Sequence, residues 1–146
     1  MKSFTHITAK TVDEASEILK KHGKQAKVIA GGSDLLGTLK DEIHPEYPEM
    51  VLNIKKIEGL EYIKEENGIL KIGALTTLKD LENTLVMKEN YPILANTAHQ
   101  IASPQIRNVA TVGGNLCQEP RCWYYRNPKN TFNCSIDVRN CGVCRC

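Results

Sequence analysis

The sequence has no long hydrophobic run, no strong excess of charge of one sign and few aromatic residues. No apolar stretch in its 146 residues approaches the length of a membrane-spanning helix, about 20 residues, and the N-terminus lacks the apolar core of a signal peptide. The net charge of +2 is too balanced to indicate nucleic acid or an anionic membrane as the main partner. These absences favour a cytoplasmic protein that binds neither nucleic acid nor membrane.

Cysteine is absent from the first 116 residues, yet six cysteines lie between Cys117 and Cys146. Disulfides in a secreted scaffold would be scattered along the chain, and they rarely persist in a reducing cytosol. The cluster therefore favours ligation of a metal or an iron–sulfur centre. We interpret Cys117, which comes shortly after the glycine pair at 113–114, as a small buried apolar residue.

Local patterns predict alternating helices and strands. We expect helices over 11–22, from 33 or 34, over 78–83 and over 92–102, strands over 27–30, 50–54 and 109–112, and a hairpin around 67–68. In the helix over 92–102 the expected inner face consists of Ile93, Leu94, Ala98 and Ile101. The division that follows is a small α/β lobe over 1–55, an incomplete α+β lobe over 56–120 and a cysteine-rich insert over 121–146.

Two glycine pairs each come directly after an expected strand. Gly31-Gly32 follows the strand over 27–30, and Gly113-Gly114 follows the strand over 109–112. Glycine lets backbone N–H groups come close to phosphate, so two facing loops would hold the two phosphates of a dinucleotide without lysine. Either pair alone is also compatible with a simple tight turn, and neither G-x-G-x-x-G nor a Walker loop is present.

Five separated motifs, at 28–36, 53–60, 72–77, 102–108 and 111–115, occur in this order. Together they resemble the FAD subunits and FAD domains of the xanthine dehydrogenase and carbon monoxide dehydrogenase family, over about residues 3–126. The resemblance implies an α+β, two-lobed FAD-binding fold of the vanillyl-alcohol oxidase type. Because family members continue well past this point, the chain is expected to be C-terminally truncated.

The resemblance also implies a set of cofactor-binding residues and no catalytic residue. The residues that would follow the pyrophosphate and adenosine are Val28, Ile29, Ala30, Gly31, Gly32, Ser33, Asp34 and Leu35. Those that would touch the flavin or the ribityl chain are Ile101 and Ala102. Those that would hold the pyrophosphate and the ribityl chain from the other side are Ala110, Thr111, Gly113, Gly114 and Asn115. We expect Arg107 to pair with a local carboxylate rather than with the cofactor.

The segment from Pro120 resembles a subgroup typified by the flavin subunit of 4-hydroxybenzoyl-CoA reductase. In that subgroup an insert after the second glycine loop carries a [4Fe-4S] cluster on four cysteines. The metal ligands that the resemblance implies here are Cys122, Cys134, Cys141 and Cys144, with Cys146 as a further candidate. Zinc or no metal remain alternatives.

The expected function is an FAD-binding electron-transfer subunit of a molybdenum-hydroxylase-type oxidoreductase. The resemblance implies two partners in the same complex, a [2Fe-2S] subunit and a molybdopterin subunit on which the substrate reacts. One alternative is a docking or electron-transfer module that bears iron–sulfur or zinc and has a non-functional flavin site. Others are a zinc-stabilised interaction module and a stand-alone flavin reductase of the enolpyruvyl-sugar type.

Overall fold

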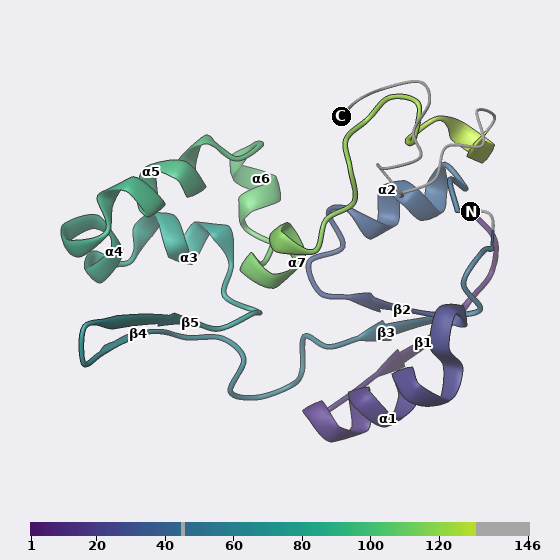
Figure 1. Cartoon of the computed structure of the whole chain (residues 1–146), viewed down its shortest axis with the longest axis horizontal. Coiled ribbons are helices and arrows are strands. Elements are labelled where there is room, and N and C mark those ends of the chain that lie inside the picture. The colour runs from purple at the N-terminus through teal and green to yellow at the C-terminus, as the bar shows by residue number, and fades with distance from the viewer. Residues whose placement is uncertain (45, 131–146) are drawn as a thin grey trace.

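The computed structural model describes residues 1–44 and 46–130 as two groups of elements joined by short helices (Figure 1). The architecture mixes helices and strands, as expected. Its elements are β1 (Thr5–Thr8), α1 (Val12–His22), β2 (Ala26–Ile29), α2 (Leu35–Lys40), β3 (Met50–Asn53), β4 (Ile63–Glu66), β5 (Ile69–Ile72), α3 (Leu78–Asn83), α4 (Leu85–Asn90), α5 (Pro92–Gln100), α6 (Pro104–Arg107) and α7 (Val112–Leu116). Two short 3₁₀ helices cover Gly23–Gln25 and Pro128–Asn130. No described helix has the length and apolarity needed to cross a membrane.

The first group is a parallel sheet in the order β1-β3-β2, with α1 and α2 packed around it. Helix α1 begins where the Thr11 side chain accepts a hydrogen bond from the Glu14 N–H, and it ends at Gly23, whose φ is 52°. Both ends agree with the helix expected over 11–22. Ala15 of α1 and Leu52 of β3 share the hydrophobic core of this group. Strand β1 was not predicted, because its four residues carry little apolar signal.

The second group is the antiparallel hairpin β4-β5 with helices α3, α4 and α5 (Figure 1). The hairpin turns at Asn67 and Gly68, both with positive φ, as the sequence predicts. Thr77 caps α3 through a reciprocal capping box with Asp80. Helix α4, whose N-terminal Thr84 makes no side-chain capping hydrogen bond, was not predicted.

The predicted inner face of α5 was partly wrong. Ile93 is 80% exposed and Leu94 is 41% exposed, whereas Ala95 and Ala98 are buried. The two alanines are three residues apart and share a core with Leu81 of α3, so small side chains form the packed face. The larger side chains of Ile93 and Leu94 therefore point outward, and no described residue covers them fully.

The strand predicted over 109–112 was also wrong. Only an isolated bridge between Thr77 and Thr111 forms there, and Val112 begins helix α7. The Thr111 side chain accepts the Gly114 N–H at 3.1 Å, and this cap overrides the β-branched character of the run. The second glycine pair consequently lies inside a short helix rather than after a strand.

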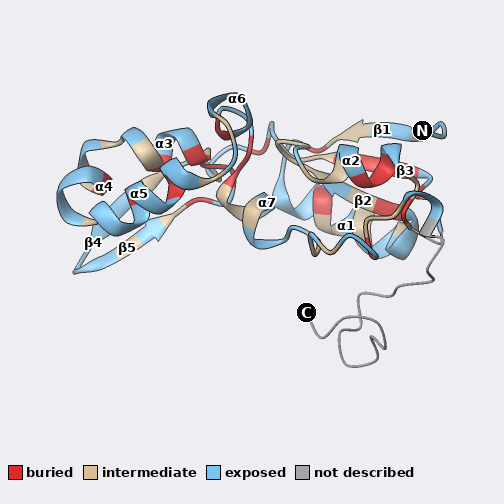
Figure 2. Ribbon diagram, turned by 90° about the horizontal axis from the view of Figure 1, so that it is seen from above, coloured by how far each residue is buried: buried red, intermediate tan, exposed pale blue. Residues whose placement is uncertain are grey.

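The two groups of elements meet where Gly31 passes close to the backbone of Val109, shortly before α7. A Cβ built on Gly31 would lie 1.9 Å from the carbonyl oxygen of Val109 and 2.7 Å from its carbon. Figure 2 shows buried segments within each group and at this junction. Only a residue without a side chain permits this approach of two backbones.

Substitution of two glycines by alanine should test the crossing. Gly31→Ala is expected to lower the free energy of unfolding by about 3 kcal/mol, because the added methyl group meets backbone that has no room to move. Gly37→Ala, in α2 with nothing within 4 Å of the added Cβ, should raise it by about 0.5–1 kcal/mol. Urea unfolding of both variants measures the difference, and equal stabilities would contradict the tight crossing.

Candidate functional site

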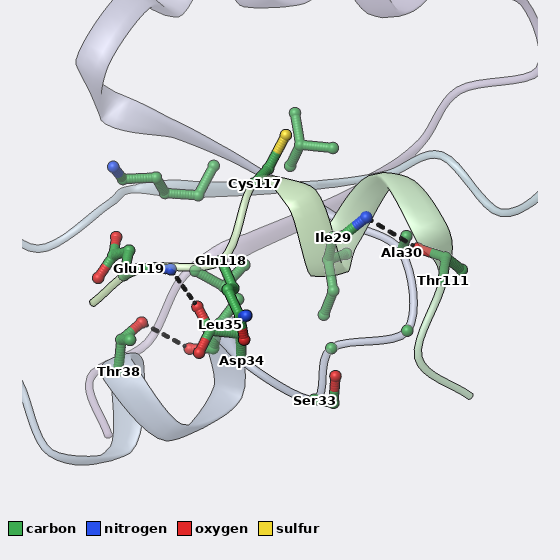
Figure 3. Close-up of a pocket in the computed structure, with 15 residues that line it drawn as sticks. Ile29, Ala30, Ser33, Asp34, Leu35, Thr38, Thr111, Cys117, Gln118 and Glu119 are labelled. Atoms are coloured by element: carbon green, nitrogen blue, oxygen red, sulfur yellow. Dashed lines mark hydrogen bonds between the residues drawn. The ribbon is translucent and has the colours of Figure 1, made fainter. Parts of the chain in front are cut away.

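Both glycine pairs contribute to one cleft of about 240 Å³ beside the end of β2 (Figure 3). One wall is the loop that leads from β2 into α2, and the other is formed by α7 and the residues that follow it. The residues that line this cleft are Lys27, Val28, Ile29, Ala30, Gly31, Gly32, Ser33, Asp34, Leu35, Thr38, Thr111, Gly114, Cys117, Gln118 and Glu119. The structure thus brings together two segments that are about eighty residues apart in the sequence.

The first glycine loop offers unused hydrogen-bond donors. Gly32 has a φ of 74°, which a residue with a side chain rarely adopts. Within residues 1–44 and 46–130, no hydrogen bond uses the backbone N–H groups of Gly31, Gly32, Ser33 or Asp34. Four consecutive N–H groups in a loop of this kind suit an anion with several oxygen atoms.

The second glycine pair does not form the matching set of donors that the sequence led us to expect. Val112 N–H donates to Thr76 at 2.9 Å, Gly113 N–H donates to Ala74 at 2.9 Å, and Gly114 N–H donates to the Thr111 side chain. Gly113 lines neither cleft, and a Cβ there would lie 2.9 Å from the Ala74 carbonyl oxygen. This pair therefore supplies close packing at Gly113 and an open, side-chain-free surface at Gly114.

A second cleft of about 410 Å³ lies next to the first and shares Ser33, Asp34, Gly114 and Gln118 with it. The residues that line it are Ser33, Asp34, Leu78, Ile101, Ala102, Ile106, Ala110, Gly114, Asn115, Gln118 and Arg121. All of the cofactor-binding residues implied by the resemblance, except Gly113, line one cleft or the other. Their roles in binding stay predictions.

A buried arginine supports the turn that carries Ala102 into the larger cleft. Ala102 has a φ of 49°, a strained value for a residue with a Cβ. Arg107 is 6% exposed and donates to the carbonyl oxygens of Ile101 and Ala102 at 3.0 and 3.4 Å. Its Nε donates to Glu82 at 2.9 Å, so the expected pairing with a local carboxylate is confirmed. The hydrogen bond from His99 and the adjacent Arg107 hold the pKa of Glu82 below its usual value.

A network of hydrogen bonds and ion pairs, which was not predicted from the sequence, attaches the segment after α7 to this site. Asp34 accepts hydrogen bonds from Arg126 at 2.6 Å and from the Glu119 N–H at 3.0 Å, while Arg121 lies 3.4 Å away. Burial, the largest single influence, raises the pKa of Asp34, but the hydrogen bonds from Glu119 and Arg126 and the two positive charges outweigh it. The pKa therefore lies below its ordinary value of 3.8. A partnership across 92 residues leaves no local signal in a sequence.

Glu119 holds the other side of the same segment. The Tyr125 hydroxyl donates to its carboxylate at 2.8 Å, and His44 Nε2 lies 3.3 Å from the second oxygen. Burial and the neighbouring Glu119 raise the pKa of Tyr125. Cys117 is exposed, so its interpretation as a buried apolar residue was wrong. Among the described residues, the Trp123 side chain is 90% exposed.

Of the four metal ligands implied by the resemblance, the structure describes only Cys122, which is half-buried. Cys134, Cys141 and Cys144, with the further candidate Cys146, lie outside the described residues. Up to residue 130 and apart from residue 45, no group of three or more His, Cys, Asp or Glu side chains is placed to hold a metal ion. The cluster therefore stays a prediction.

The paired carboxylate gives a pH-dependent test of the network. Because the pKa of Asp34 is depressed in the folded state, its contribution to stability is present above 3.8 and is lost as the pH falls through the folded-state pKa. Asp34→Asn should lower the free energy of unfolding, measured with urea at pH 7, by about 1 kcal/mol, and this loss should become smaller towards pH 3. Asp41→Asn, at the other end of α2, is the matched charge control, and a pH-independent cost for Asp34→Asn would contradict the network.

Comparison with known proteins agrees with this geometry. Residues 2–122 match the family model described as the FAD binding domain in molybdopterin dehydrogenase. The nicotinate dehydrogenase FAD-subunit of Eubacterium barkeri is 40% identical over 80% of this chain and 39% of that protein. The aldehyde oxidoreductase FAD-binding subunit PaoB of Escherichia coli (strain K12) is 34% identical over 98% of this chain and 44% of that protein.

A solved structure shows the same arrangement of elements. Carbon monoxide dehydrogenase from Hydrogenophaga pseudoflava, in a form that lacks the Mo-pyranopterin moiety of the molybdenum cofactor, superimposes with a TM-score of 0.74 at 36% identity. The likeness covers 79% of this chain and 39% of that chain. The chain thus spans less than half the length of the relatives that it matches. Because the family model matches most of the sequence, the chain belongs to the family of FAD-binding domains of molybdopterin dehydrogenases.

Proposed function

We propose that this chain binds FAD across the two adjacent clefts and serves as the electron-transfer subunit of a molybdopterin-dependent oxidoreductase. The observation that carries the proposal is the first glycine loop, whose N–H groups make no hydrogen bond among the described residues and which lines the same cleft as Gly114. A loop of donors opposite a surface without side chains suits the pyrophosphate of a dinucleotide. The family match and the FAD-subunit relatives support the same cofactor.

The order of residues along the clefts suggests how the cofactor lies. Ser33, Asp34 and Gly114 line both clefts, so we assign the pyrophosphate to the place where the clefts join. Residues 28–30, in the smaller cleft, would hold the adenosine, and Ile101 and Ala102, in the larger cleft, would face the flavin or ribityl chain. Arg107 would act indirectly, by fixing the strained turn at Ala102.

FAD, when bound, supplies a redox group that exchanges electrons singly with iron–sulfur centres and in pairs with a hydride donor. The chain's own residues would bind and orient FAD. We assign the role of acid or base to no side chain that lines the described clefts. By analogy with relatives that are subunits of molybdenum enzymes, the partners would be a [2Fe-2S] subunit and a molybdopterin subunit in the cytoplasm. Substrate chemistry would take place on the molybdopterin partner.

An absorption spectrum with a flavin assay tests the proposal. The purified chain, supplied with FAD, should show resolved flavin bands and retain close to one flavin per chain. Gly114→Val should fold normally yet lose most of the flavin, because the side chain would enter both clefts and meets only the Thr111 hydroxyl nearby. Gly37→Ala is the control that should keep flavin. Absence of flavin from the wild-type chain would overturn the proposed function, and full retention by Gly114→Val would overturn the assigned position.

The cysteine-rich segment gives a separate prediction. If Cys122 is one of four thiolate ligands, Cys122→Ser should lose most of the iron of anaerobically purified protein, because three thiolates hold a [4Fe-4S] cluster poorly. Cys117→Ser, in the exposed position beside α7, should keep its iron. Iron and zinc assays on both variants make the measurement, and unchanged iron in Cys122→Ser would remove this residue from the ligand set.

A further inference from the structure

We propose that Arg121, which the family resemblance does not assign, binds the phosphate groups of the cofactor at the join of the two clefts. The inference rests on the proposed FAD function and names a residue for it. Arg121 lines the larger cleft together with Ser33 and Gly114, the residues to which the pyrophosphate is assigned. The positive charge would come from the first residue of the cysteine-rich insert over 121–146 rather than from either glycine loop.

The side chain of Arg121 lies at the cleft, and its neighbours use only some of its hydrogen-bond donors. One terminal nitrogen donates to the Gln118 side-chain oxygen at 3.1 Å and lies 3.4 Å from Asp34. The Arg121 side chain remains 65% exposed, whereas that of Arg126 is 19% exposed. A guanidinium carries five N–H donors, so Arg121 keeps donors for an anion after these two contacts.

Asp34 does not need Arg121 to balance its charge. Arg126 donates to one carboxylate oxygen at 2.6 Å, and the Glu119 N–H donates to the other at 3.0 Å. Arg126 is itself fixed by the backbone oxygens of Glu119 and Pro120. With Asp34 paired in this way, the charge of Arg121 is available to a ligand at the larger cleft.

The second glycine pair explains why a cation is needed. The N–H groups of Val112, Gly113 and Gly114 are used within the protein, so of the two glycine pairs only the first has backbone N–H groups left unused among the described residues. A pyrophosphate carries charge on both phosphates, and one loop of amides leaves part of that charge unmatched. Arginine forms paired hydrogen bonds with phosphate oxygens, which makes it the suitable side chain for the remaining side.

The test compares FAD with riboflavin, which lacks phosphate, in binding measurements on the full chain. Arg121→Ala should weaken FAD binding roughly 10- to 100-fold and leave riboflavin binding unchanged. Arg121→Lys should restore part of the FAD affinity, because it keeps the charge but not the paired geometry. Lys129→Ala is the matched control, since it removes the same charge from the same segment but lines neither cleft.

The outcomes separate this inference from the proposed function. Wild-type FAD affinity in Arg121→Ala would overturn the assignment of Arg121 and leave the FAD function in place. Equal losses for FAD and riboflavin would also overturn it, because they would show a structural role. Failure of the wild-type chain to bind FAD at all would overturn both.

Discussion

The contact between Gly31 and the carbonyl of Val109 is the constraint on which the site depends. Any side chain at position 31 would collide with that carbonyl, so the parallel sheet and the helical group can meet at this point only through glycine. Once the two backbones are this close, the loop after β2 and the start of α7 form opposite walls of one cleft. The adjoining larger cleft follows, because Ser33 and Gly114 belong to both.

The two glycine pairs look alike in the sequence but have different roles in the structure. Among the described residues the first pair keeps its N–H groups unused, whereas Gly113 and Gly114 of the second pair donate theirs to Ala74 and Thr111. Gly113 is needed because a Cβ would meet Ala74, and Gly114 is needed because it leaves the cleft surface bare. One pair therefore offers hydrogen bonds and the other offers space, a distinction set by partners that lie far from the motif.

Features that depend on local chemistry were predictable from the sequence, and features that depend on distant partners were not. The caps at Thr11 and Thr77 and the hairpin at 67–68 follow from nearby residues, and the structure contains them. The inner face of α5 was mispredicted, because size matching against α3 selected alanines over larger apolar residues. The wall formed by Gln118, Glu119 and Arg121 was missed, since only the folded chain places it beside Asp34.

Asp34 shows how the charged network and the glycine loop depend on each other. Its position before α2 would normally lead its carboxylate to cap the helix and to occupy the N–H groups of the first turn. No such hydrogen bond forms, because Arg126 and the Glu119 N–H hold the carboxylate instead. For an anionic ligand, this pairing means that the negative charge closest to the N–H groups of the loop is neutralised. If the loop binds phosphate as proposed, the Asp34 carboxylate within it is compatible with that ligand only while the segment after α7 is docked. That segment would then belong to the binding site.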